Sequence, residues 1–442
     1  MSDLTPEREQ QFRSMRATAR DIFTAALKSA SIASAFSRHL HCERGVLRIS
    51  EDLYDLNSYS RVFVVSIGKA AHTMAAALEA QVGSRLEGIV ASSVDPPSQV
   101  RGFRYFQGGH PTPTAESIHA AEAILKSLGS LDSASLVIFM LSGGGSSIVE
   151  KPIDDEISLD DLIATYRTLV HSGAPIAEIN AIRKHLSAVK GGRLAQAAAP
   201  AQQVSILVSD VPDSTPDALA SGPTMPDSTS IHDCERIAAR HNLTEQLPKS
   251  VAELFLQHAL DETPKSDDPA FVRARWWTVL SNKIAIDEAA IAATNAGFAV
   301  EVDNSCDDWD YQKAADYLLT RLRDLRSKVS RVCLLSGGEV TVQVRNGGVG
   351  GRNQQFALAC AEKISGDEIT VLSAGTDGID GNSPAAGAVV DGGTLQRAGG
   401  LDVLRGALAT FNAYPLFEAL GDTIVTGPTG NNVRDLRILI TY

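Results

Sequence analysis

Short, continuous runs of apolar residues recur along the chain, and each run stops at glycine or at small polar residues. Three of them lie in the first half of the chain, at Val62–Ser66, Leu136–Leu141 and Val204–Val208. Helical patterns lie between them, at about 69–81 and 114–128. Continuous apolar strands that alternate with helices are typical of a parallel sheet covered on both faces. The sequence therefore predicts an α/β fold.

The length of 442 residues exceeds what one hydrophobic core organises, which favours two domains. A polar stretch with a proline, LDETPKSDD at 260–268, has the composition of a linker. Strand and helix patterns resume after it, beginning at Trp277–Leu280. We place the boundary near 265–275, between an N-terminal domain at 12–265 and a smaller C-terminal α/β domain at 273–442.

Composition argues against several classes of function. The formal net charge of −13 disfavours a nucleic-acid surface, which needs a basic field. Five scattered cysteines without CxxC spacing disfavour a disulfide framework or a zinc site. The charged start MSDLTPEREQ lacks the apolar core of a signal peptide, and no apolar run is long enough to span a bilayer. We expect a cytoplasmic protein that binds neither nucleic acid nor membranes.

The sequence SGGGSS at Ser142–Ser147 directly follows a buried strand. Glycines allow backbone N–H groups to approach a phosphate, and the carboxyl end of a strand is where open α/β sheets bind ligands. The alternative is a tight turn without a ligand. Neither GxxxxGK[ST] nor GxGxxG is present, so a P-loop or a standard dinucleotide site is not predicted.

Two cations are placed to meet an anion. Lys69 lies at the start of a helix just after a strand, where the helix end and the ammonium group would address the same anion. Arg352 follows the glycines that begin at Gly347, and its guanidinium suits two phosphate oxygens at once. The alternatives are an exposed lysine and a glycine-rich hairpin.

The densest basic group lies at 179–195, which we predict to be helical, with glycines at 191 and 192 that either end or interrupt the helix. Arg183, Ser187 and Lys190 then share one side of the helix, beside an apolar stripe. For Arg183, Lys190 and Arg193 we expect a structural role or a role facing an anion.

Two aspartates follow predicted strands. Asp210 is placed to meet a metal ion or to accept a proton. Asp377 is the best placed of three aspartates, with Asp380 and Asp391, that are interleaved with glycines after the strand at 369–373.

Together these segments resemble the class II glycerate 2-kinases, the family with a C-terminal MOFRL domain. The resemblance covers nearly the whole chain and rests on motifs in the same order: SIGKAA at 66–71, GGHPTP at 108–113, RKHLSAVKGGRLA at 183–195, GGRNQ at 350–354, GTDGIDG at 375–381 and TGPTGNNV at 426–433. It implies a Rossmann-like N-terminal domain and an active site between the two domains. It also implies phosphorylation of D-glycerate to 2-phospho-D-glycerate by direct in-line transfer from ATP, with Mg²⁺ or another divalent cation.

The resemblance matches the family's key lysine and arginine to Lys69 and Arg352 and implies a nucleotide-phosphate role for Ser142–Ser147, whereas the roles of the other residues are inferred from their own places in the sequence. The expected catalytic residues are Lys69, Arg352 and Asp210, with Lys69 and Arg352 acting on the same phosphoryl group. Asp210 and Asp377 are the expected metal ligands. The expected ATP and phosphate ligands are Gly143, Gly144, Gly145, Ser146, Ser147, Lys190 and Arg193.

The chain departs from the family pattern in two places. SDVPDSTP at 209–216 replaces a common SDVxGDDP, so Ser214 and Thr215 stand where the family has acids, whereas Asp210 is retained. GGRNQQ replaces GGRNQE, a change from glutamate to Gln355 at a helix position that tolerates either residue.

Two other functions are compatible with the sequence. Relatives of this family are often named hydroxypyruvate reductases, which would require a site for NAD(P)H. A nucleotide sensor without catalysis would use the same charged residues for binding only. The sequence leaves open whether the chain forms a homo-oligomer.

Overall fold

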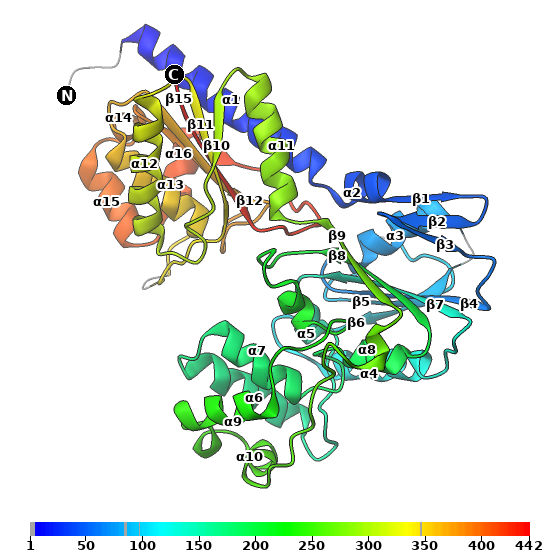
Figure 1. Cartoon of the computed structure of the whole chain (residues 1–442). Coiled ribbons are helices and arrows are strands. Elements are labelled where there is room, and N and C mark those ends of the chain that lie inside the picture. Colours follow the sequence, from blue (N-terminus) through cyan, green and yellow to red (C-terminus); the bar gives the residue numbers. More distant parts are fainter. Residues whose placement is uncertain (1–4, 84–85, 97, 345–346) are drawn as a thin grey trace. The chain divides into compact units, whose positions relative to one another are not determined.

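Figure 1 shows the computed structural model of the chain, which describes residues 5–83, 86–96, 98–344 and 347–442. The chain divides into two compact units. We call Ala35–Val279 the parallel-sheet unit, and Leu280–Tyr442 together with the residues up to Ser34 the mixed-sheet unit. Both units combine helices with a sheet, which confirms the predicted α/β class. In the described part of the chain, no helix has the length and apolar character needed to cross a membrane.

The parallel-sheet unit is built on one six-stranded sheet. Its strands are β4 (Arg61–Ile67), β5 (Glu87–Ser92), β6 (Phe103–Gln107), β7 (Ser135–Ser142), β8 (Gln202–Val208) and β9 (Ala274–Leu280). They lie in the order β6-β5-β4-β7-β8-β9, and parallel pairings join the first five. Counted along the chain, this is the strand order 3-2-1-4-5-6 of doubly wound folds, which bind ligands where the order reverses. The reversal lies between β4 and β7.

Helices and a small sheet complete this unit. A three-stranded antiparallel sheet comprises β1 (Leu40–Glu43), β2 (Val46–Ile49) and β3 (Asp52–Asp55). The helices after it are α3 (Ala71–Val82), α4 (Ala115–Leu128), α5 (Gly145–Ile148), α6 (Leu159–His171), α7 (Ile176–His185), α8 (Arg193–Ala198), α9 (Ile231–Arg240) and α10 (Lys249–Leu256). Four of them, α6, α7, α9 and α10, share a hydrophobic core of their own around Leu162, Ile182 and Ile237.

The mixed-sheet unit has strands β10 (Ala299–Val302), β11 (Val332–Gly338), β12 (Ile369–Gly375), β13 (Gly387–Asp391), β14 (Thr423–Ile424) and β15 (Asp435–Thr441). Their order is β10-β11-β15-β12-β13-β14. Only the β10–β11 pairing is parallel among these described strands. The central strand β15 is the last in the chain, so this sheet is complete only when the C-terminal residues are in place.

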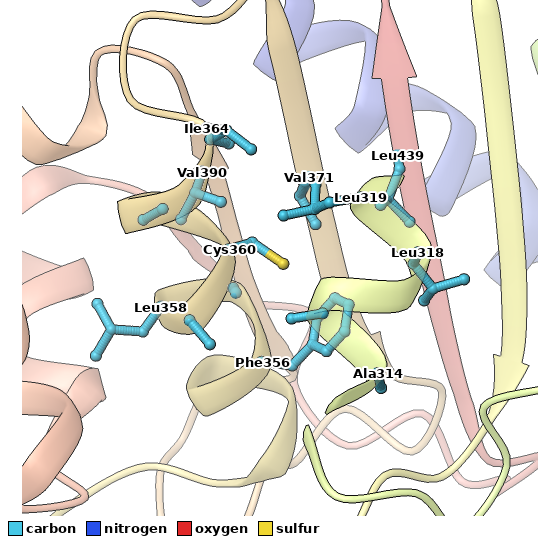
Figure 2. Close-up of a cluster of buried hydrophobic side chains, with 14 of the residues drawn as sticks. Ala314, Leu318, Leu319, Phe356, Leu358, Cys360, Ile364, Val371, Val390 and Leu439 are labelled. Carbon is cyan, nitrogen blue, oxygen red and sulfur yellow. The ribbon is translucent and has the colours of Figure 1, made fainter. Parts of the chain in front are cut away.

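Helices cover both faces of the mixed sheet (Figure 1). One face packs on α1 (Pro6–Ser29) and α11 (Asn282–Asn295). The other face packs on α12 (Tyr311–Arg326), α13 (Arg352–Lys363), α14 (Thr394–Arg397), α15 (Leu401–Ala409) and α16 (Ala413–Leu420). Figure 2 shows the second core, to which α13 contributes Phe356, α12 contributes Leu318 and β15 contributes Leu439.

The observed division differs from the predicted limits of 12–265 and 273–442. The chain crosses between units at Val279–Leu280, because β9 pairs into the parallel sheet. Helix α1 belongs to the mixed-sheet unit, because its apolar face, including Phe12 and Phe23, packs on the strands of that unit. Two helices precede the first strand, since α1 ends at Ser29 and α2 (Ile32–His39) begins after it.

The polar stretch at 260–268 is not a linker between the units. Thr263 is buried, and its hydroxyl donates to Asp227 at 3.0 Å. Lys265 donates to the backbone of Thr229, and the backbone carbonyl of Asp261 accepts from Arg193. These hydrogen bonds hold a polar segment against the parallel-sheet unit, which composition alone does not reveal.

Candidate active site

The turns after β4 and β7 meet where the strand order reverses. Ile67 pairs with Leu141 at the ends of the two strands. The backbone N–H of Lys69 donates to the carbonyl of Gly143 at 2.9 Å, and that of Ala70 donates to Ser142 Oγ at 3.1 Å. Two sequence motifs that lie far apart in the chain therefore form one structure.

Glycine is required in this structure for two reasons. Gly68 has φ +121°, and a Cβ there would lie 2.5 Å from the backbone oxygen of Ser142. Gly144 has φ +81°, in the left-handed region. The backbone of the turn is thus free of side chains and open to a ligand, as the phosphate-binding hypothesis for Gly143–Ser147 requires.

Two side chains border the turn at Gly144. A Cβ on this glycine would lie 3.2 Å from Lys69 Cγ and 2.9 Å from His110 Cδ2. Lys69 is exposed. Burial, and then the charge of Lys69, lowers the pKa of His110, so its imidazole is neutral near pH 7. His110 lies in the GGHPTP segment, for which no role in the site was predicted from the sequence.

Asp210 also reaches the turn. Val208, at the end of β8, pairs with Ser142 at the end of β7. A Cβ on Gly143 would lie 2.0 Å from Asp210 Oδ2, so the carboxylate occupies the space beside this glycine. Lys69, Gly143–Ser147 and Asp210 therefore form one group.

A cavity of about 470 Å³ opens beside the turn. It lies between the turn, the segment His110–Pro113, α6 and α7. Its lining residues are His110, Pro111, Thr112, Pro113, Gly144, Ser146, Ser147, Ile163, Tyr166, Arg167, Val170, His171 and Arg183.

The predicted helix over 179–195 is interrupted. Helix α7 ends at His185, and α8 begins at Arg193. Ser187 leaves the helix because its Oγ donates to Glu150 at 2.6 Å, and it forms a β-bridge with Pro152. The expectation that Ser187 and Lys190 lie beside Arg183 on one helix is therefore wrong.

Lys190 and Arg193 are held by the protein itself. Lys190 is buried; it donates to Glu150 and, at 2.9 Å, to the hydroxyl of Tyr166. Arg193 donates to the carbonyls of Asp261 and Glu262 at 3.2 and 3.4 Å. Neither lines the cavity beside the turn. These contacts support the structural alternative for both residues, and their role as phosphate ligands stays a prediction.

Arg352 begins α13 in the mixed-sheet unit. Its Nε and Nη2 donate to the two oxygens of Asp435 at 2.6 and 3.0 Å, and Nη2 lies 2.7 Å from Glu339 Oε1. Burial by itself lowers its pKa, but the hydrogen bond and charge of Asp435, with Glu339, raise it above the ordinary value. The guanidinium is therefore oriented and always charged.

A cavity of about 700 Å³ opens beside Arg352, within the mixed-sheet unit. It is lined by the carboxylates of Asp308, Glu339, Asp377 and Asp380 and by apolar side chains such as Val342. Asp377, the residue predicted from the sequence, accepts the backbone N–H of Ile379 at 3.1 Å.

Asp380 has a second role beside the same cavity. It is buried and accepts the backbone N–H groups of Asn353 and Gln354, at 3.0 and 2.9 Å, at the start of α13. Burial raises the pKa of Asp380 to about 6, against the effect of these hydrogen bonds. Asp391 lies elsewhere, buried and paired with Arg16. The sequence pattern could not separate these roles.

Within the described residues, no three metal-binding side chains gather at one point. Asp210 and Asp377 belong to different units. Mg²⁺ is commonly held by one or two carboxylates and by substrate phosphates, so three protein ligands are not needed. The place of Asp210 beside the glycine turn fits one such ligand.

Comparisons with known proteins cover both units. Residues 18–256 match a family described as a domain of unknown function, DUF4147, and residues 332–435 match the MOFRL family. A D-glycerate 2-kinase of Thermotoga maritima is 35% identical over 88% of this chain and 93% of its own length. A protein of Agrobacterium vitis named a putative hydroxypyruvate reductase is 37% identical over 86% of this chain and 87% of its own. A crystal structure of glycerate kinase from Thermotoga maritima aligns with a TM-score of 0.84 at 32% identity, over 97% of this chain and 100% of that one.

Replacing Glu150 with glutamine should destabilise the protein, because the charge of Lys190 would stay buried without its partner. The expected loss is about 3–5 kcal/mol of unfolding free energy. The double variant Glu150→Gln/Lys190→Met should recover most of that loss. Chemical denaturation of both variants measures the difference. Equal stability of the two would show that Lys190 does not depend on Glu150.

Asp380 should make stability depend on pH. Its pKa in the fold, about 6, lies above the value of 3.8 for an unperturbed aspartate. The stability that it contributes is therefore fully present below the unfolded value and is lost as pH rises through about 6. The stability difference between the wild type and Asp380→Asn should shrink from pH 4 to pH 7, measured by urea denaturation. A difference that grows over that interval would contradict the raised pKa.

Proposed function

Because the chain belongs to the glycerate 2-kinase family, we propose that it transfers the γ-phosphoryl group of ATP to the 2-hydroxyl of D-glycerate. The observation that carries the proposal is the group at the reversal of strand order. There Lys69 and Asp210 border a glycine turn whose backbone has no side chains in the way. This group combines a cation, a carboxylate and backbone N–H groups. Those are the parts that phosphoryl transfer requires.

The role that we propose for each residue follows from its contacts and its exposure. Backbone N–H groups of Gly143–Ser147 bind nucleotide phosphates, and the exposed ammonium of Lys69 neutralises the charge that spreads over the transferred group. The carboxylate of Asp210 either orients the acceptor hydroxyl or holds a divalent cation. When bound, Mg²⁺ supplies charge neutralisation at the phosphates, and Asp210 is the residue of this group that fits it.

We propose that Arg352, which belongs to the mixed-sheet unit, binds phosphate oxygens of the substrate. Within the described residues, its contacts with Asp435 and Glu339 use Nε and Nη2. The Arg352 side chain is 36% exposed, so an anion can approach it while Asp435 keeps the guanidinium plane fixed. That Lys69 and Arg352 act on the same phosphoryl group stays a prediction.

The reaction itself is tested by its product. The protein is incubated with D-glycerate, ATP and Mg²⁺, and ³¹P NMR separates 2-phosphoglycerate from 3-phosphoglycerate. We expect the 2-phosphate. Formation of the 3-phosphate alone, or of no phosphorylated product, would refute the proposal.

Hydroxypyruvate reduction is a second candidate, because a similar protein carries that name and the strand order is one that also binds dinucleotides. The turn after β4 reads SIGKAA, however, without the glycine pattern of such sites. Oxidation of NADH or NADPH with hydroxypyruvate, in the absence of ATP, would favour the reductase.

Loss of either cation should slow turnover strongly. Lys69→Ala and Arg352→Ala are each expected to lower kcat by about 100- to 1,000-fold, as loss of transition-state charge stabilisation does. Thermal melting should be unchanged for Lys69→Ala, which is exposed, but lowered for Arg352→Ala, because the buried carboxylate of Asp435 loses its partner.

Lys126→Ala, an exposed lysine on α4 of the same unit as Lys69, serves as the control and should keep normal turnover. The double variant tests whether the two cations act together, since residues that act on one group show non-additive losses. Near-normal turnover in both single variants would remove Lys69 and Arg352 from the mechanism.

A further inference from the structure

We propose that Arg183 binds the carboxylate of the hydroxy-acid substrate in the cavity beside the glycine turn. This inference rests on the proposed function, since it assigns the substrate's anionic end to the same site. It makes Arg183 a specificity-determining residue that selects a carboxylate and orients the neighbouring hydroxyl.

The charge of Arg183 is not balanced in the way that its neighbours' charges are. Lys184, the next residue, lies 2.9 and 3.2 Å from the carboxylates of Asp217 and Asp227, and Lys190 pairs with Glu150. For Arg183, no ion pair with a carboxylate is found in the described part of the chain, and its Nε is buried without a hydrogen-bond partner. Burial lowers the pKa of Arg183, against an opposing effect of Tyr166. A largely buried charge without a counter-charge is costly, and an anion bound in the cavity that Arg183 lines would lower that cost.

The guanidinium is held in one orientation. Its central carbon lies 4.5 Å from the centre of the Tyr166 ring, in a cation–π contact. The ring is itself fixed, because the hydroxyl of Tyr166 donates to Glu150 and accepts from Lys190. The buried Lys190–Glu150 pair thus positions Tyr166, and Tyr166 positions Arg183. A planar guanidinium fixed in this way matches the two oxygens of a carboxylate.

The cavity favours an anion. No aspartate or glutamate is found among its described lining residues, although the chain as a whole has a net charge of −13. Its other basic lining residues are Arg167, His110 and His171. The positive potential of the cavity is therefore local and opposite in sign to the net charge of the protein.

The remaining lining suits a small hydroxy acid. Thr112, Ser146 and Ser147 offer hydroxyl groups of the kind that hydrogen-bond to the hydroxyls of such an acid. In glycerate the 2-hydroxyl is on the carbon next to the carboxylate. Fixing the carboxylate at Arg183 therefore restricts where that hydroxyl lies. The phosphates of ATP carry several charges and are assigned to the glycine turn and Lys69.

Arg183→Met tests the proposal, because methionine keeps much of the length and loses the charge. The KM for D-glycerate should rise about 10- to 100-fold, the effect of losing a charge-assisted bidentate contact, while the KM for ATP stays within about twofold. Arg183→Lys should recover part of the lost affinity for D-glycerate, since lysine restores the charge but not the two parallel N–H donors of a guanidinium. Arg236→Met, at an exposed arginine on α9 of the same unit, is the control and should keep both KM values.

Binding is measured separately by calorimetry without ATP. Wild-type protein should bind D-glycerate more tightly than glycerol, which lacks the carboxylate, and Arg183→Met should lose this preference. Melting curves establish that each variant is folded. A raised KM for ATP with an unchanged KM for D-glycerate would overturn the proposal in favour of a nucleotide phosphate at Arg183. Unchanged KM values for both would overturn it as well.

Failure of the inference and failure of the proposed function give different results. If the wild type phosphorylates D-glycerate and Arg183→Met has a normal KM, the inference falls and the function stands. If the wild type binds D-glycerate in a manner that depends on Arg183 but does not phosphorylate it, the kinase proposal falls and the carboxylate site stands.

Discussion

The hydrogen bond between the backbone N–H of Lys69 and the carbonyl of Gly143 joins the two turns on which the site is built. It forms because β4 and β7 are parallel neighbours that end at the same level of the sheet. Close approach of the two turns leaves no room for a Cβ at Gly68. The same approach brings Asp210, at the end of the next strand, against the turn. The strand order of one sheet thus determines which side chains can meet a ligand.

The sequence carried enough information for the α/β class and for the group around the glycine turn. Strand ends followed by glycine are a local signal, and parallel strands bring their carboxyl ends to one edge, so Lys69, Gly143–Ser147 and Asp210 could be placed together. The segment at 179–195 could not be interpreted in this way. Helical spacing predicted one continuous face, but the buried carboxylate of Glu150 draws Ser187 and Lys190 out of the helix. That carboxylate is distant in sequence and leaves no periodic signal.

The partners of charged residues also could not be predicted from the sequence. Arg352 was recognisable from the glycines before it, whereas Asp435, which orients it, lies on the last strand of the chain. Asp377 and Asp380 have the same local setting of glycines, yet only Asp380 caps α13. Whether a charge is balanced by the protein depends on contacts between distant segments. This is why Lys190 and Arg183, seven residues apart in one basic segment, have different surroundings.

The division of the chain has a consequence for biosynthesis. The parallel-sheet unit is one continuous segment, so its core can form while the ribosome is still translating the C-terminal part of the chain. The mixed-sheet unit combines a segment before the parallel-sheet unit with a segment after it, and its central strand β15 follows the other described strands in the sequence. Helix α1 is therefore synthesised before the parallel-sheet unit, whereas the strands that cover Phe12, Met15 and Phe23 are synthesised after it. Its apolar face must be kept from wrong partners while the whole parallel-sheet unit is made, a task for which cells use chaperones.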